Sequence, residues 1–96
     1  MYLLTAEDFQ PWVGRKVRVT ALPASVEVTL ERIHRHPPLR GIDTREPFSL
    51  FFDAPLDVML LDTTYQFDCG KGGPHEIHIT QLMPSATMRH YEAVFT

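Results

Sequence analysis

The segment Phe48-Ser49-Leu50-Phe51-Phe52-Asp53 decides the fold, because it holds three of the six phenylalanines in a chain of 96 residues. Phe48, Leu50 and Phe52 alternate along it, as apolar residues do on one face of a β-strand. Phe51 points to the opposite face. We therefore predict a strand that is covered on both sides.

Five further segments with a period of two accompany this strand. Their predicted bounds are residues 16–21, 26–33, 64–69, 75–83 and 89–95. Ile33 lies one residue out of phase with the alternation before it, which indicates a β-bulge near Glu31-Arg32. Turn-forming residues at 23–25 and 70–74 predict antiparallel hairpins between neighbouring strands.

One segment, residues 5–13, favours a helix, because a capping threonine and two carboxylates open it and a proline and a glycine follow. We expect this helix to place Phe9 and Trp12 on the core. Residues 56–62 fit either a helical turn or an irregular crossing. About six strands and one short helix predict a single all-β domain over residues 1–96, folded as a small antiparallel barrel or a rolled sandwich.

Charge and composition exclude several classes of function. The formal net charge is −3, so the chain has no strong positive field and we expect no nucleic-acid partner. No apolar segment has the length of a membrane-spanning helix, and the first residues do not form a signal peptide, so we expect no membrane association. Cys69 is the single cysteine, which favours a cytoplasmic location.

The longest stretch without a period, residues 36–47, contains prolines and a glycine that exclude a central strand. Long loops in compact domains commonly carry function. Charged residues and two histidines coincide here, which suits recognition of an acidic partner. The candidate partner-binding residues are His34, His36, Arg40, Arg45 and Glu46. A solvated loop with local ion pairs is the alternative interpretation.

The histidines raise a metal hypothesis, since His34 and His36 share one strand face and His75 and His78 could add ligands. Residues 75 and 78, however, face opposite sides of a regular strand, and His36 adjoins two prolines. Cys69 ends a strand on the apolar face, which favours an inert thiol over a nucleophile. We therefore expect no metal site, no cofactor and no catalytic residue, so that the protein is not an enzyme.

The chain resembles a family of small bacterial proteins that is known as a domain of unknown function. Three blocks carry the resemblance: residues 4–9 with Val13-Gly14, residues 45–52 with Pro55, and residues 91–95. The resemblance implies an all-β bacterial domain and assigns no catalytic residue. Some members are encoded beside tail-fibre or collar-like proteins, which implies an accessory role in assembly.

These observations favour a non-catalytic protein-interaction or assembly domain. We expect the partner to be another protein or a second copy of the chain, paired through the main chain at residues 48–52 or 91–95. One alternative is a small-ligand-binding barrel that uses Tyr65, Trp12 or the His34 and His36 region at its mouth. The other alternative is a metal-dependent enzyme built from the histidines.

Overall fold

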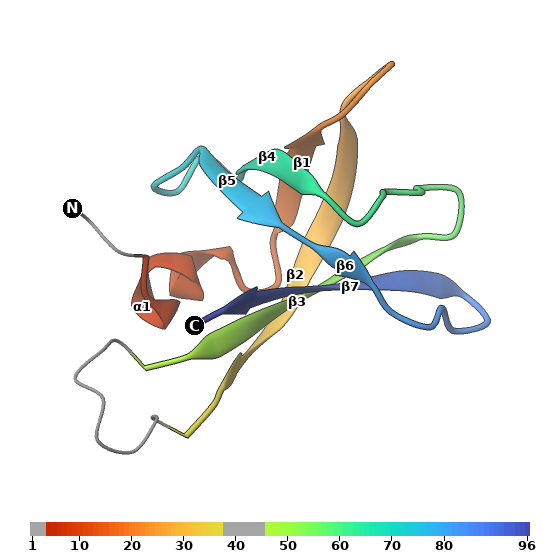
Figure 1. The fold of residues 1–96 in the computed structure, drawn as a ribbon. Helices are drawn as coiled ribbons and strands as arrows, with labels where there is room; N and C mark the ends of the chain where they lie inside the picture. The colour runs from red at the N-terminus through yellow and green to blue at the C-terminus, as the bar shows by residue number, and fades with distance from the viewer. Residues whose placement is uncertain (1–3, 38–45) are drawn as a thin grey trace.

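The computed structural model describes residues 4–37 and 46–96, which form one mostly antiparallel β-sheet and a short N-terminal helix (Figure 1). The described elements, in chain order, are α1 (Ala6–Phe9), the 3-10 helix η1 (Gln10–Trp12), β1 (Lys16–Thr20), β2 (Val26–Arg35), β3 (Phe48–Pro55), β4 (Thr64–Asp68), β5 (His75–His78), β6 (Thr80–Gln81) and β7 (Met88–Phe95). Within these residues no helix is long and apolar enough to cross a membrane.

The sheet curls into a nearly closed barrel with the strand order β5-β4-β1-β2-β3-β7-β6. Its two outermost strands, β5 and β6, are consecutive in the chain and only Ile79 separates them. The chain thus passes from one edge of the sheet to the other within a single buried residue. The prediction of an all-β fold is confirmed, and the sheet is barrel-like. The described residues form seven strands because the predicted strand 75–83 divides at Ile79.

The predicted hairpins and the bulge are confirmed. β1 pairs with β2 and β4 pairs with β5, in both cases antiparallel. The register between β2 and β3 shifts between Leu30 and Arg32, where the phase change at Ile33 predicts a bulge. Gly70 and Gly72 adopt positive φ angles of 76° and 89° in the β4–β5 turn, a conformation that side chains with a Cβ disfavour.

The aromatic strand β3 lies inside the sheet, between β2 and β7. β3 pairs with β7 along its whole length and with β2 from Phe48 to Asp53. Its alternate residues Phe48, Leu50 and Phe52 are buried in the barrel, as predicted. The expectation that residues 48–52 offer an edge to another chain is wrong, because both sets of main-chain groups are already paired within the sheet.

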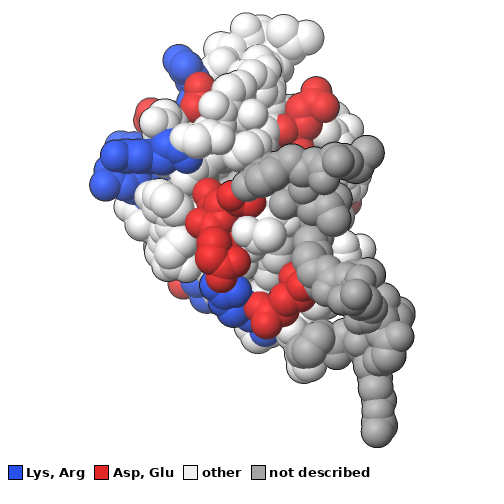
Figure 2. All heavy atoms as spheres, turned by 90° about the vertical axis from the view of Figure 1, so that its left-hand side faces the viewer, with Lys and Arg blue, Asp and Glu red and all other residues white. Residues whose placement is uncertain are grey.

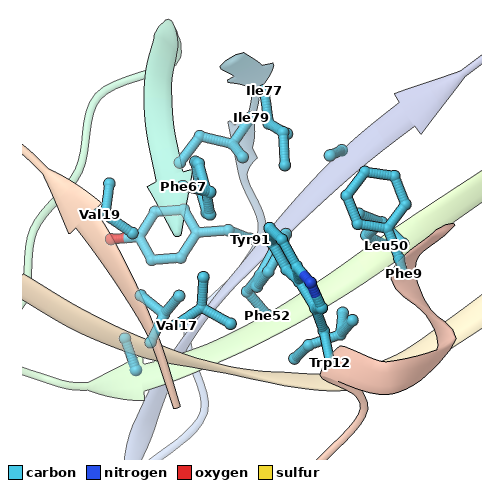
Figure 3. Close-up of a cluster of buried hydrophobic side chains, with 14 of the residues drawn as sticks. Phe9, Trp12, Val17, Val19, Leu50, Phe52, Phe67, Ile77, Ile79 and Tyr91 are labelled. Atoms are coloured by element: carbon cyan, nitrogen blue, oxygen red, sulfur yellow. The ribbon is translucent and has the colours of Figure 1, made fainter. Parts of the chain in front are cut away.

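The core fills the barrel with aromatic rings that arrive from different elements. Trp12, Phe52, Phe67 and Tyr91 converge in Figure 3 from η1, β3, β4 and β7, and all four are buried. Phe9 packs edge-on against Trp12 with ring centroids 5.1 Å apart. The expected placement of Phe9 and Trp12 by the N-terminal segment is confirmed.

The helical segment covers the gap that the sheet leaves between β5 and β7. The Phe9 ring lies 5.5 Å from the His75 ring of β5 and 5.5 Å from the Phe95 ring of β7, measured between centroids. Asp8 supports the start of α1, since its Oδ2 accepts a hydrogen bond of 2.7 Å from the Thr5 amide. The apolar side chains of this helix therefore replace main-chain pairing where the barrel stays open.

Candidate functional site

Three of the five predicted partner-binding residues lie together at one end of the barrel. His34 is near the end of β2, His36 follows this strand, and Glu46 precedes β3. The His36 amide donates a hydrogen bond of 2.9 Å to the Pro47 carbonyl, which closes the paired strands. Arg40 and Arg45 lie outside the described residues.

Arg35 connects this group to the N-terminal helix. Its Nη2 atom lies 2.7 Å from Oε2 of Glu7, and its Nη1 atom lies 3.1 Å from Oε1 of Glu46. We refer to Glu7, His34, Arg35, His36 and Glu46 as the strand-end cluster. Figure 2 faces this end of the molecule, where acidic side chains gather with Lys and Arg side chains beside them. Sequence reasoning missed the roles of Arg35 and Glu7, which are 28 residues apart in the chain.

The ion pairs of the cluster shift two pKa values. The hydrogen bond from Arg35 lowers the pKa of Glu7, and the positive charge of the guanidinium adds to this effect. Hydrogen bonds to Glu7 and then Glu46 raise the pKa of Arg35. All three side chains are substantially exposed, so these contacts orient the charges and add little to stability.

His36 and Ser49 bring an imidazole and a hydroxyl group into hydrogen-bond contact at this end of the barrel. Nε2 of His36 lies 2.8 Å from Oγ of Ser49. Ser49 is completely buried, so its hydroxyl satisfies the histidine and is not accessible to a substrate. The His34 ring packs edge-on against the His36 ring with centroids 4.7 Å apart. Residues 4–37 and 46–96 contain no group of three His, Cys, Asp or Glu side chains placed to hold a metal ion.

The remaining two histidines of the metal hypothesis point in different directions, as their odd spacing predicts. His75 stacks on Trp12 at the core, with ring centroids 5.8 Å apart. His78 is exposed on the outer face, where its Nδ1 atom lies 3.3 Å from Oγ1 of Thr64. β5 therefore does not bring the two imidazoles together.

A second candidate surface is an apolar hollow of about 540 Å³ between the β1–β2 turn and the connection from β3 to β4. We refer to it as the Leu22 groove, and its lining residues are Thr20, Ala21, Leu22, Met59, Leu60, Leu61 and Tyr65. Both segments are visible in Figure 1, the turn at the top and the connection in green at the right. Leu22 is 96% exposed, Leu61 69% and Met59 64%, whereas Leu60 between the last two is only 2% exposed. Large apolar side chains thus face solvent around a buried one.

Tyrosine hydroxyl groups fix the backbone of this groove. The Tyr91 hydroxyl accepts a hydrogen bond of 2.9 Å from the Leu60 amide and donates one of 3.0 Å to the Val58 carbonyl. The Tyr65 hydroxyl accepts a bond of 3.0 Å from the Leu61 amide. Residues 56–62 contain a turn and no helix, so the irregular crossing is the correct one of the two predicted alternatives. The backbone that carries Met59 and Leu61 is therefore fixed by hydrogen bonds at Val58, Leu60 and Leu61.

Sequence reasoning found one residue of the groove and missed the others. Tyr65 was expected at the barrel mouth, and it does line the hollow. Trp12 was expected there too, but it is buried and its Nε1 atom donates a hydrogen bond of 2.7 Å to the Lys71 carbonyl. The available signal is the apolar run from Val58 to Leu61, which has no strand period and therefore cannot bury every member.

The fold and its two candidate surfaces define a small antiparallel β-barrel domain with a filled interior and a hollow on its outside. Residues 4–95 match the family model of a domain of unknown function, DUF6916. The chain therefore belongs to this family. No curated protein and no solved structure shows a significant match to the chain.

Proposed function

We propose that the protein is a non-catalytic protein-interaction or assembly domain and that the Leu22 groove is its binding surface. The observation that carries this proposal is the exposure of Leu22, Met59 and Leu61 around one hollow. Clustered exposed apolar side chains mark interaction sites more often than singly scattered ones. Burying them against a partner releases water from apolar surface, which is the main driving force of association.

The fixed backbone of the groove supports this function. The hydrogen bonds of Tyr91 and Tyr65 hold the segment that carries Met59 and Leu61 before any partner arrives. Binding then costs less conformational entropy than it would for a loop that orders on contact. A preorganised apolar surface of this kind suits protein recognition.

The strand-end cluster gives less support to a catalytic function than the Leu22 groove gives to protein binding. Its Ser49 hydroxyl is buried under His36, and its charged groups are paired with one another. The barrel interior also offers little room for a small ligand, since Trp12, Phe52 and Tyr91 fill it (Figure 3). Among the described surfaces, the external Leu22 groove is therefore a stronger candidate for a binding site than the strand-end cluster or the barrel interior.

A comparison of two exposed apolar positions tests the proposal. Leu61→Asp introduces a charge in the groove, and Met83→Asp is the matched control, because Met83 is 86% exposed and does not line the groove. The two variants and the unmodified protein serve as baits in affinity purification from the native host. A tail-fibre or collar-like protein encoded nearby is the first partner to examine.

We expect the unmodified protein and Met83→Asp to retain the same partner and Leu61→Asp to lose it. Retention of that partner by all three baits would contradict a role for the groove. Equal melting temperatures of the three proteins serve as the folding control, since both substituted side chains lie largely outside the core.

A further inference from the structure

We infer that the Leu22 groove binds a protein segment in which apolar side chains are flanked by lysine or arginine. This partner class rests on the proposed function and states the chemistry of what the same groove takes. Most of the side chains that line the hollow are apolar, and carboxylates stand at both ends of one of its two segments. An apolar contact with basic flanks is complementary to both features.

The two segments that form the groove carry negative charge and no positive charge. The β1–β2 turn is uncharged, and residues 56–65 contain Asp57 and Asp62 but no lysine, arginine or histidine. Asp57 lies two residues before Met59, and Asp62 directly follows Leu61. A carboxylate thus stands at each end of the stretch that presents the exposed apolar side chains.

Both aspartates are exposed and lie on backbone that hydrogen bonds hold in place. The Val58 amide donates a hydrogen bond of 3.0 Å to the Pro55 carbonyl, which closes the turn that contains Asp57. Oδ1 of Asp62 accepts a hydrogen bond of 2.8 Å from the Gln81 amide, which ties this carboxylate to β6. A partner therefore meets two carboxylates whose attachment points are set before binding.

Neither carboxylate has an ion-pair partner within the part of the chain that the structure describes. The ion pairs found there join other groups, and none of them includes Asp57 or Asp62. Arg89 contacts this connection, but its Nε atom donates a hydrogen bond of 2.6 Å to the Leu56 carbonyl and not to a carboxylate. The two aspartates can therefore pair with cations that a partner brings.

The same carboxylates disfavour two other occupants of an apolar surface. A second copy of the chain would bring its own Asp57 and Asp62 to the contact, and like charges placed together oppose binding. An anionic membrane surface is repelled for the same reason, since helices that bind such surfaces combine apolar side chains with lysine and arginine. A protein segment with basic flanks meets neither penalty.

Selection from a random peptide library displayed on phage tests the chemistry of the partner. The bait is the unmodified protein, and clones that bind Leu61→Asn are removed first, because this variant alters the apolar contact and keeps the net charge. We expect the remaining clones to share large apolar residues flanked by lysine or arginine. Clones with uncharged or acidic flanks, or no clone that distinguishes the two proteins, would overturn the inference.

A pair of charge-matched variants tests the role of the aspartates with the tightest selected peptide, by fluorescence anisotropy. Asp57→Asn should weaken binding about two- to fivefold, as the loss of one exposed ion pair does, and added salt should reduce the difference. Glu31→Gln removes the same charge from an exposed side chain outside the groove and should leave the affinity unchanged. Equal weakening by both variants would show that only the net charge matters and would contradict the inference.

These outcomes are distinct from failure of the proposed function. A host partner that Leu61→Asp loses and that Asp57→Asn retains at undiminished affinity would keep the groove as the binding surface and exclude the basic flanks. Equal melting temperatures establish that Asp57→Asn, Glu31→Gln and Leu61→Asn are folded, since all three side chains are exposed.

Discussion

The Leu22 groove and the strand-end cluster are built in opposite ways. In the groove, the Tyr91 hydroxyl binds the backbone on both sides of Met59 and the buried Leu60 anchors the segment. In the strand-end cluster, Arg35 joins Glu7 and Glu46 through side chains that remain exposed to water. Hydrogen bonds that are sheltered from water hold the first surface, and solvated ion pairs hold the second.

This difference separates a rigid surface from an adjustable one. A sheltered hydrogen bond is costly to break, because the groups it frees do not regain water easily. An exposed ion pair exchanges its partner for water at little cost. The groove is therefore the surface with a fixed shape, which is the property that specific protein recognition requires.

The largest expected effect is a difference in stability between alanine variants of two adjacent leucines, Leu60 and Leu61. Leu60→Ala removes a buried side chain and should destabilise the protein by about 2–5 kcal/mol, since it leaves a cavity. Leu61→Ala should change stability by about 0.5 kcal/mol or less, because its side chain is mainly in solvent. Urea denaturation followed by tryptophan fluorescence measures both. Similar midpoints for the two variants would show that the segment is not anchored at Leu60.

A smaller effect should come from the hydroxyl group that fixes the groove. Tyr91→Phe leaves the Leu60 amide and the Val58 carbonyl without this partner and should cost about 1–3 kcal/mol. Tyr65→Phe removes one exposed hydrogen bond and should cost less. Urea midpoints give the stability change, and amide hydrogen exchange at Leu60 reports the local effect. Unchanged exchange in Tyr91→Phe would contradict the role of the hydroxyl.

The smallest effect on stability should come from the strand-end cluster and should depend on pH. The pKa of Glu7 is lowered in the folded state, so its contribution is present above the pKa of an unfolded glutamate, about 4.3. That contribution is lost as the pH falls through the lower folded value. Carboxyl NMR titration should show a depressed pKa for Glu7 that returns toward the usual value in Arg35→Gln. An unchanged pKa in this variant would exclude the ion pair.

Most of the fold could be predicted because the strand period is a local signal. The alternation at Phe48, Leu50 and Phe52 and the phase change at Ile33 each appear within a few residues. The division of the predicted strand 75–83 into β5 and β6 could not be predicted in this way. Ile77 and Ile79 keep the same phase and are both buried, so the pattern conceals the change from one sheet edge to the other.

The candidate site was less predictable, since a surface combines segments that are far apart in the chain. Charge and an unusual loop mark His34, His36 and Glu46 in the sequence, and the structure places them together at one end of the barrel. Leu22 and Met59 were missed, because an apolar residue in sequence is taken as a core residue by default. The exposure of Met59 follows from the hydrogen bonds of Tyr91 to Val58 and Leu60 on either side of it, and these bonds depend on the tertiary fold.

The proposed function places protein binding at the Leu22 groove, whose exposed apolar residues are Leu22, Met59 and Leu61. Affinity purification from the native host with Leu22→Asp and Met83→Asp as baits compares a groove position with an exposed apolar position outside the groove. We expect Leu22→Asp to lose the partner that Met83→Asp and the unmodified protein retain. Retention of that partner by Leu22→Asp would show that the groove does not bind it.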